Sequence, residues 1–158
     1  MAQRRGYGDE VWWLARDGKV EALQRAAELL SAHEGDLDYE AHRARAFAIA
    51  VEGRADDALA ELNEGWTDDW PFPAAYAADV ARVRFLAGDH DGALTALELS
   101  ARSAERVDGE LPELVRLCVA RRPELWTRAL RVVLAGGPPA QRARAAAAVV
   151  KSRFGGDA

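Results

Sequence analysis

The chain has very little cysteine, and it has no long apolar run. Cys118 is its single cysteine, which excludes an internal disulfide. The longest apolar runs, at 46–51 and 145–150, are far too short to span a bilayer. Residues 1–10 contain no apolar stretch of the kind found in a secretory signal. We therefore expect a cytoplasmic protein with no membrane association.

Lysine is nearly absent, and charge is unevenly spread. Only Lys19 and Lys151 are lysines among the 21 cationic residues, a bias typical of a GC-rich genome, so we expect a bacterial source. The net charge of −5 hides an asymmetry. Residues 1–70 hold 8 cationic and 16 acidic residues, whereas residues 114–158 hold 9 and 2. The amino-terminal part is therefore acidic and the carboxy-terminal part basic.

The basic carboxy-terminal third has several possible roles. It could contact an acidic protein, form a solvated surface, or pair with the acidic half of another copy, so a homo-oligomer is possible. We do not expect a nucleic-acid partner, because the whole chain is acidic and no known nucleic-acid-binding motif is present.

One stretch of sequence occurs twice. Residues 53–62 read GRADDALAEL and residues 88–97 read GDHDGALTAL, so both fit G-x-x-D-x-A-L-x-x-L. A looser copy begins at Gly18, and the three glycines stand 35 residues apart (53 − 18 = 88 − 53 = 35). A fixed period of this length is typical of a stacked array of helical repeats.

The chemistry of the repeated stretch predicts a helical hairpin. Gly53 and Gly88 can end a first helix, because glycine reaches positive φ without a Cβ clash. Ala58 and Ala93 allow the second helix to approach the first closely, and the following leucines share their face. A single hairpin cannot bury its apolar face alone, so neighbouring hairpins must stack.

The periodic segments predict nine helices in a single domain over residues 9–154, with flexible tails at 1–8 and 155–158. Asp9 is the expected N-cap of the first helix. The last helix places Ala143, Ala146, Ala147, Val150 and Phe154 on one side, a face that we expect to cap the array. The expected helices cover residues 10–16, 19–32, 39–52, 56–63, 73–87, 91–106, 111–121, 124–134 and 140–154.

The two good copies of the repeat resemble tetratricopeptide repeats. The small and apolar positions of that pattern are filled in the first copy by Ala46, Ile49, Gly53, Ala58 and Leu62, and in the second by Ala81, Gly88, Ala93 and Leu97. Arg84 and Ser100 depart from it, since an aromatic and an alanine are usual there. The resemblance implies an all-α, right-handed solenoid of about four helix-turn-helix hairpins with a C-terminal capping helix.

The same resemblance implies a concave face that binds a partner peptide. Carried over position by position, the face consists of Trp12, Arg16, Arg43, Phe47, Arg82 and Phe85. Arginines among aromatics suit a protein or peptide partner with acidic residues. The alternative is that the aromatics belong to the core and the arginines are merely solvated.

Two further groups of aromatic residues are notable. The linker 65–73 holds Trp66, Asp68, Asp69 and Trp70, which could form a recognition loop, pack over hairpin ends, or supply oxygen ligands. Two adjacent aspartates without further ligands are a weak metal signal, so we expect no metal and no cofactor. Trp12 and Trp13 are consecutive and cannot face the same way on a helix, so one should be buried and the other exposed.

The sequence carries no recognisable catalytic motif. His33, His42 and His90 are scattered, and Cys118 lies in an apolar helical segment that predicts an inert buried thiol. These observations favour a non-catalytic protein-interaction scaffold. An accessory or regulatory subunit of a larger enzyme or transcription complex is the first alternative. A small enzyme whose site no motif reveals is the second.

Overall fold

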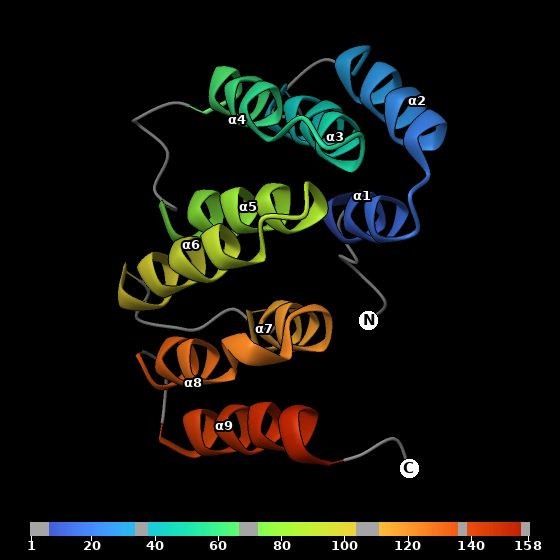
Figure 1. Ribbon diagram of the computed structural model, residues 1–158. Coiled ribbons are helices and arrows are strands. Elements are labelled where there is room, and N and C mark those ends of the chain that lie inside the picture. The colour runs from blue at the N-terminus through green and yellow to red at the C-terminus, as the bar shows by residue number, and fades with distance from the viewer. Residues whose placement is uncertain (1–6, 34–37, 67–72, 104–110, 136–138, 156–158) are drawn as a thin grey trace, which may run out of the picture. The chain divides into compact units, whose positions relative to one another are not determined.

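The chain is helical throughout the part that its computed structural model describes, namely residues 7–33, 38–66, 73–103, 111–135 and 139–155 (Figure 1). No strand occurs within these ranges. The prediction of an all-α fold is therefore confirmed. No helix in these ranges has both the length and the apolar character needed to cross a membrane.

The chain divides into two compact units. The first comprises Met1–Pro71 with Leu86–Gly88, and the second comprises Phe72–Phe85 with Asp89–Ala158. Each unit is described by itself below. The expectation of one domain over residues 9–154 stays a prediction.

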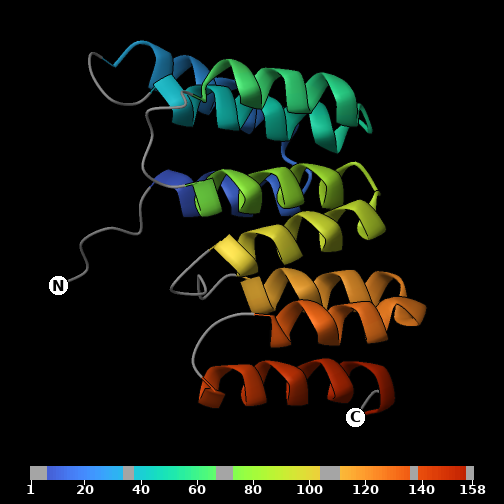
Figure 2. The same cartoon turned by 90° about the vertical axis from the view of Figure 1, so that its left-hand side faces the viewer.

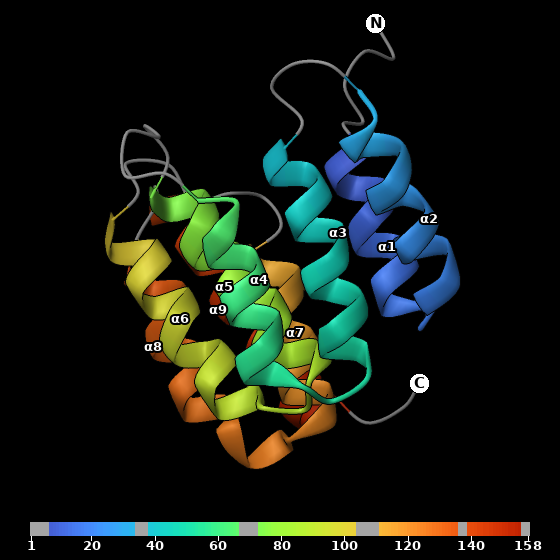
Figure 3. The ribbon, with the colours of Figure 1, turned by 90° about the horizontal axis from the view of Figure 1, so that it is seen from above.

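The first unit is built around α3. It contains α1 (Tyr7–Arg16), α2 (Val20–Ser31), α3 (Asp38–Val51) and α4 (Ala55–Glu64). Helix α3 packs against the other three (Figure 3). It therefore buries residues on most of its circumference, and five of these are alanines: Ala41, Ala44, Ala46, Ala48 and Ala50. Small side chains allow several helices to approach one helix closely.

Helix α1 settles two expectations about the amino-terminal segment. It begins at Tyr7, so Asp9 lies in its first turn and the predicted N-cap at Asp9 is wrong. Trp12 is 4 % exposed and Trp13 is 65 % exposed. The prediction of one buried and one exposed tryptophan is therefore confirmed.

The second unit contains α5 (Pro73–Leu86), α6 (His90–Ser103), α7 (Leu111–Arg121), α8 (Trp126–Leu134) and α9 (Pro139–Phe154). Helices α5 and α6 lie side by side, and α7, α8 and α9 form the following layers (Figure 2). Helix α7 contacts α6, α8 and α9. Helix α8 is preceded by a short 3₁₀ turn, Pro123–Leu125, where the fixed φ of Pro123 suits a first helical position.

The three repeat glycines occupy matching turns. Gly18, Gly53 and Gly88 have φ values of 68°, 86° and 89°, in the left-handed region that favours glycine. In each turn the next residue donates its N–H to a carbonyl five residues back, at 2.9 Å for Lys19 to Leu14, 3.3 Å for Arg54 to Ile49 and 2.8 Å for Asp89 to Arg84. This bond belongs to the Schellman helix ending. The prediction that Gly53 and Gly88 lie between helices is confirmed.

The positions that are buried recur at the same distance from each repeat glycine. Ala58 and Ala93, each five residues after its glycine, are 0 % exposed, as predicted. Leu62 and Leu97, four residues further on, are also buried. In the looser first copy the same two positions hold Leu23 and Ala27, which are buried too. The copies therefore share a burial pattern even where the residue type differs.

The last helix does not pack through the face that the sequence predicted. Helix α9 buries Ala145 and Val149, which are four residues apart, and it contacts α7 and α8. Ala143, Ala147, Val150 and Phe154 are exposed instead, and Ala146 is half-buried. Alanine occurs on every side of this helix, so its apolar periodicity does not single out one face.

Candidate interaction surfaces

Three of the six predicted partner-binding residues form a buried cluster in the first unit. The ring of Trp12 meets the ring of Phe47 edge-on, with 6.0 Å between centroids. The guanidinium of Arg43 lies over the Phe47 ring, 4.7 Å from its centroid, and its Nη1 is 3.5 Å from Glu40 Oε2. All three side chains are buried. The cluster therefore contributes to the packing of α1 against α3 and is closed to a partner.

Two more predicted residues are buried in the second unit. Arg82 Nη1 donates to Asp79 Oδ1 at 2.7 Å, between two buried side chains of α5. Phe85 meets the His90 ring edge-on, with 5.3 Å between centroids. These contacts hold Arg82 and Phe85 within the protein. Arg43 and Phe47 belong to one unit and Arg82 to the other, so their predicted adjacency stays a prediction.

Arg16 is the one exposed member of the predicted set. It ends α1, and Trp13 lies three residues before it on the same helix. Residues three apart on a helix are neighbours on its surface, so the exposed indole and the guanidinium share one face of α1. Sequence reasoning named Trp12 for partner contact, whereas the accessible indole is that of Trp13.

Of the four residues predicted to form a recognition loop, the structure describes only the first, Trp66. Trp66 is half-buried and meets the Tyr39 ring edge-on, with 6.2 Å between centroids. This contact agrees with an indole that packs over the end of a hairpin. Asp68, Asp69 and Trp70 lie outside the described residues.

A polar cluster joins three helices of the first unit. Glu61 Oε1 on α4 accepts from Arg45 Nε at 2.7 Å and lies 2.8 Å from His42 Nδ1, both on α3. Arg45 Nη1 also donates to Ser31 Oγ on α2 at 3.0 Å. A Cβ at Gly65 would stand 2.7 Å from the His42 Cβ, so glycine is needed beside the cluster. The cluster therefore ties α2, α3 and α4 together.

The carboxyl of Glu61 responds to these neighbours. Partial burial raises its pKa, but hydrogen bonds and charge from Arg45 and His42 together outweigh that effect and hold the pKa below its ordinary value. Glu61 is therefore ionised at neutral pH. Sequence reasoning missed the cluster, because Glu61 lies 16 and 19 residues from Arg45 and His42, Ser31 lies 14 residues from Arg45, and these spacings follow no motif.

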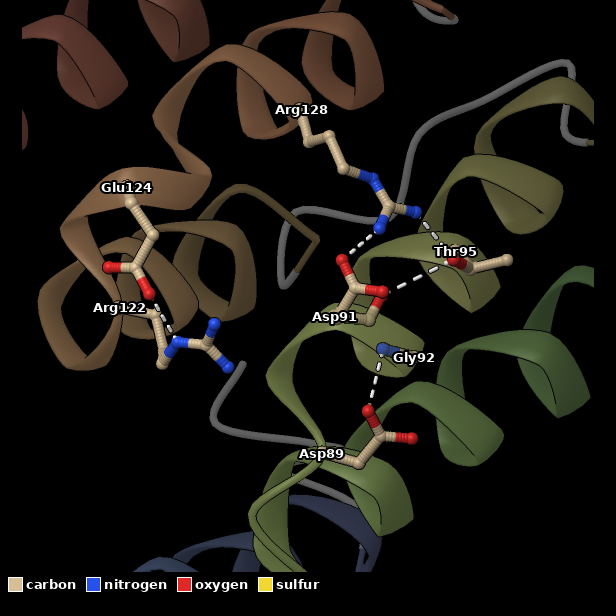
Figure 4. Close-up of polar contacts among 7 residues, drawn as sticks. All are labelled: Asp89, Asp91, Gly92, Thr95, Arg122, Glu124 and Arg128. Atoms are coloured by element: carbon tan, nitrogen blue, oxygen red, sulfur yellow. Dashed lines mark hydrogen bonds and ion pairs between the residues drawn. The ribbon is translucent and has the colours of Figure 1, made fainter.

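A second polar group lies at the start of α6 (Figure 4). Asp89 Oδ1 accepts from the Gly92 N–H at 2.8 Å, which caps the helix. Arg128 on α8 reaches across to Asp91 and to the Thr95 hydroxyl, and Arg122 pairs with Glu124 nearby. The contacts of Arg128 join α6 to α8. Arg122 and Arg128, two cations of the predicted basic region, are therefore paired with carboxylates of the chain itself.

Five further cations of the basic region lie on the surface of the second unit. Arg116 and Arg121 on α7, Arg131 on α8, and Arg144 and Lys151 on α9 are all exposed. Within the described ranges none of these five side chains has a hydrogen bond or ion pair. The second unit therefore presents unneutralised positive charge to solvent.

The cysteine is unreactive, and the metal-ligating residue types do not gather in the described ranges. Cys118 is fully buried, and burial raises the pKa of its thiol to about 12. The nucleophilic thiolate is therefore negligible at neutral pH. Within the same ranges no three residues among His, Cys, Asp and Glu gather closely enough to hold a metal ion.

Comparison of the chain with family models, with curated proteins and with solved structures finds no match.

Proposed function

We propose that the chain is a non-catalytic protein-interaction scaffold, built as a right-handed tetratricopeptide-like solenoid with α9 as its capping helix. The matching glycine turns carry this proposal. Gly18, Gly53 and Gly88 are 35 residues apart, share positive φ and end their helices with the same hydrogen bond. Repeated hairpins of this kind stack into extended binding surfaces.

The polar groups support a scaffold over an enzyme. His42 and Arg45 on α3 bind Glu61 on α4, Arg45 also binds Ser31 on α2, and Arg128 on α8 binds Asp91 and Thr95 on α6. Each group is thereby used to join helices. The high pKa of the Cys118 thiol argues against a role for it as a nucleophile.

The exposed face of α1 is the proposed partner contact. Five of the six residues expected from the family resemblance are buried, which leaves Arg16 and adds its neighbour Trp13. A tryptophan that is 65 % exposed provides the apolar anchor typical of binding hot spots. The guanidinium beside it suits an acidic residue in the partner segment.

The test compares two exposed apolar residues of the same unit. Partners are recovered from a lysate of the source organism with the wild-type protein and are purified for direct titration. Trp13→Ala should weaken binding by about tenfold or more, since a hot-spot truncation costs about 2 kcal/mol or more. Leu29→Ala is the matched control, because Leu29 on α2 is 69 % exposed. Equal binding by the two variants would contradict the proposed α1 contact, and the absence of any specific partner would contradict the scaffold function.

A further inference from the structure

The outward face of α9 is apolar and basic. Opposite the buried pair Ala145 and Val149, the helix exposes a row of Ala143, Ala147 and Val150. At the end of the helix Phe154 is 60 % exposed, although its ring meets the Trp126 ring of α8 edge-on, with 5.2 Å between centroids. Arg144 and Lys151 lie along one side of this row. The helix contains no acidic residue at all. This face therefore combines exposed apolar surface with charge of one sign.

The outward face of α4 has the opposite charge. Opposite the buried pair Ala58 and Leu62, it exposes Asp56, Asp57 and Glu64 around the small Ala60. Helix α4 contains no cationic residue. Within the described ranges the Asp57 carboxylate contacts only the exposed Arg54 side chain, at 3.0 Å, and the carboxylates of Asp56 and Glu64 have no hydrogen bond or ion pair. These carboxylates are available to an outside cation.

The charges on the two helices have the same spacing. Asp57 and Glu64 are seven residues apart, as are Arg144 and Lys151. Seven residues span about 10.5 Å along an α-helix. An antiparallel pairing sets Asp57 against Lys151 and Glu64 against Arg144, and it also aligns the two helix dipoles favourably. The small side chains of Ala60 and Ala147 lie near the middle of the paired segments and allow a close approach.

We propose that α9 of one copy of this chain binds α4 of a second copy, antiparallel and head to tail. Charge complementarity favours α4 of a second copy as the partner of α9. Pairing α9 with α9 would oppose cations with cations, and pairing α4 with α4 would oppose carboxylates with carboxylates. Each copy uses two different surfaces, so the contact is heterologous and assemblies larger than a dimer can form. This inference does not depend on the proposed partner of α1.

The test needs only the purified full chain. Sedimentation velocity of the wild type over a wide concentration range should show an average mass that rises above that of the monomer at about 0.02 M salt and falls back at about 0.5 M. One variant reverses α9 with Arg144→Glu and Lys151→Glu, and a second reverses α4 with Asp57→Lys and Glu64→Lys. Each reversal alone should weaken association by at least roughly tenfold, because two attractions become two repulsions.

Mixing the two reversed variants is the decisive step. Each carries the charge that the other needs, so an equimolar mixture should associate again while either variant alone stays monomeric. Arg116→Glu with Arg121→Glu is the matched control, since it makes the same change of charge on exposed residues of α7 and should leave association unchanged. Far-UV circular dichroism checks that every variant is folded, and Arg144→Gln with Lys151→Gln provides a milder second change.

Three results would overturn the proposal. The first is a wild type that stays monomeric at low salt over the whole concentration range. The second is a mixture of the reversed variants that fails to associate. The third is a control variant on α7 that dissociates as strongly as the α9 variant, because charge in general, and not the α9 face, would then drive assembly.

Discussion

Arg82 and Asp79 form an ion pair at 2.7 Å within α5, with side chains that are only 7 % and 5 % exposed. They lie three residues apart, so one helix brings them together. A buried charge is tolerated when a partner of opposite sign satisfies it. Arg82 is therefore held inside the protein by its own helix, although its position in the repeat suggested contact with a partner.

Removing one member of this pair should be costly. We expect Asp79→Ala to lower the free energy of unfolding by about 3–5 kcal/mol, because it leaves the Arg82 guanidinium buried without this carboxylate. Urea unfolding followed by circular dichroism measures the loss. Glu98→Ala is the matched control, since it breaks the largely exposed pair with Arg102 at 2.7 Å on α6 and should cost less than about 1 kcal/mol. Similar losses in both variants would contradict the buried pair.

A second prediction concerns the close approach at Ala58. Ala58→Leu should overpack the side of α4 that faces the core and cost about 1–3 kcal/mol. Ala60→Leu places the same side chain two residues away on the exposed side of α4 and should change the unfolding free energy by less than about 0.5 kcal/mol. Thermal or urea unfolding of both variants gives the comparison. Equal stability in the two would argue against the hairpin packing.

The pKa of Glu61 predicts a pH-dependent contribution to stability. Burial alone would raise it, but Arg45 and His42 hold it below its ordinary value. A carboxyl with a lowered folded-state pKa stabilises the fold above its unfolded-state pKa, which is about 4.3 for glutamate, and this contribution is lost as the pH falls through the folded-state value.

The substitution Glu61→Gln removes this charge at every pH. It should therefore cost about 1 kcal/mol at pH 7, and the difference from wild type should shrink toward zero in acid. Urea unfolding at several pH values measures the difference. Glu64→Gln, at the exposed end of the same helix, should have little effect at any pH. A cost for Glu61→Gln that does not change with pH would contradict the charged cluster.

The buried thiol gives a prediction about reactivity. Cys118 is 0 % exposed and burial raises its pKa to about 12, so folded protein at pH 8 should react with a thiol-specific alkylating agent only as fast as it unfolds. The same protein in concentrated urea should be labelled rapidly and once per chain. Mass spectrometry over time follows both reactions. Rapid labelling of folded protein would show that the thiol is accessible.

Much of the local structure was predictable because it depends on neighbouring residues. The glycines end helices because they reach positive φ, and the start of α5 at Pro73 and the end of α7 at Arg121 agree with the expected bounds. The 35-residue period also predicted the burial of Ala58 and Ala93. These features follow from residue type and periodicity alone.

The partner-binding residues were harder to predict, because exposure depends on which helices surround a position. Helix α3 is enclosed by three others, so Arg43 and Phe47 are buried where the family resemblance suggested a binding face. The Glu61 cluster was invisible for a related reason, since its members come from helices that meet only in the folded chain.

The sequence by itself determined the helical class, the turns at Gly18, Gly53 and Gly88, and the separation of acidic from basic residues along the chain. Each of these depends on local conformational preference or on composition. Only the tertiary structure decided that Trp13 and not Trp12 is exposed, and that α9 packs through Ala145 and Val149. Both decisions depend on which side of the helix meets its neighbours. That choice minimises the exposed apolar area of all the assembled helices together and not of one helix alone.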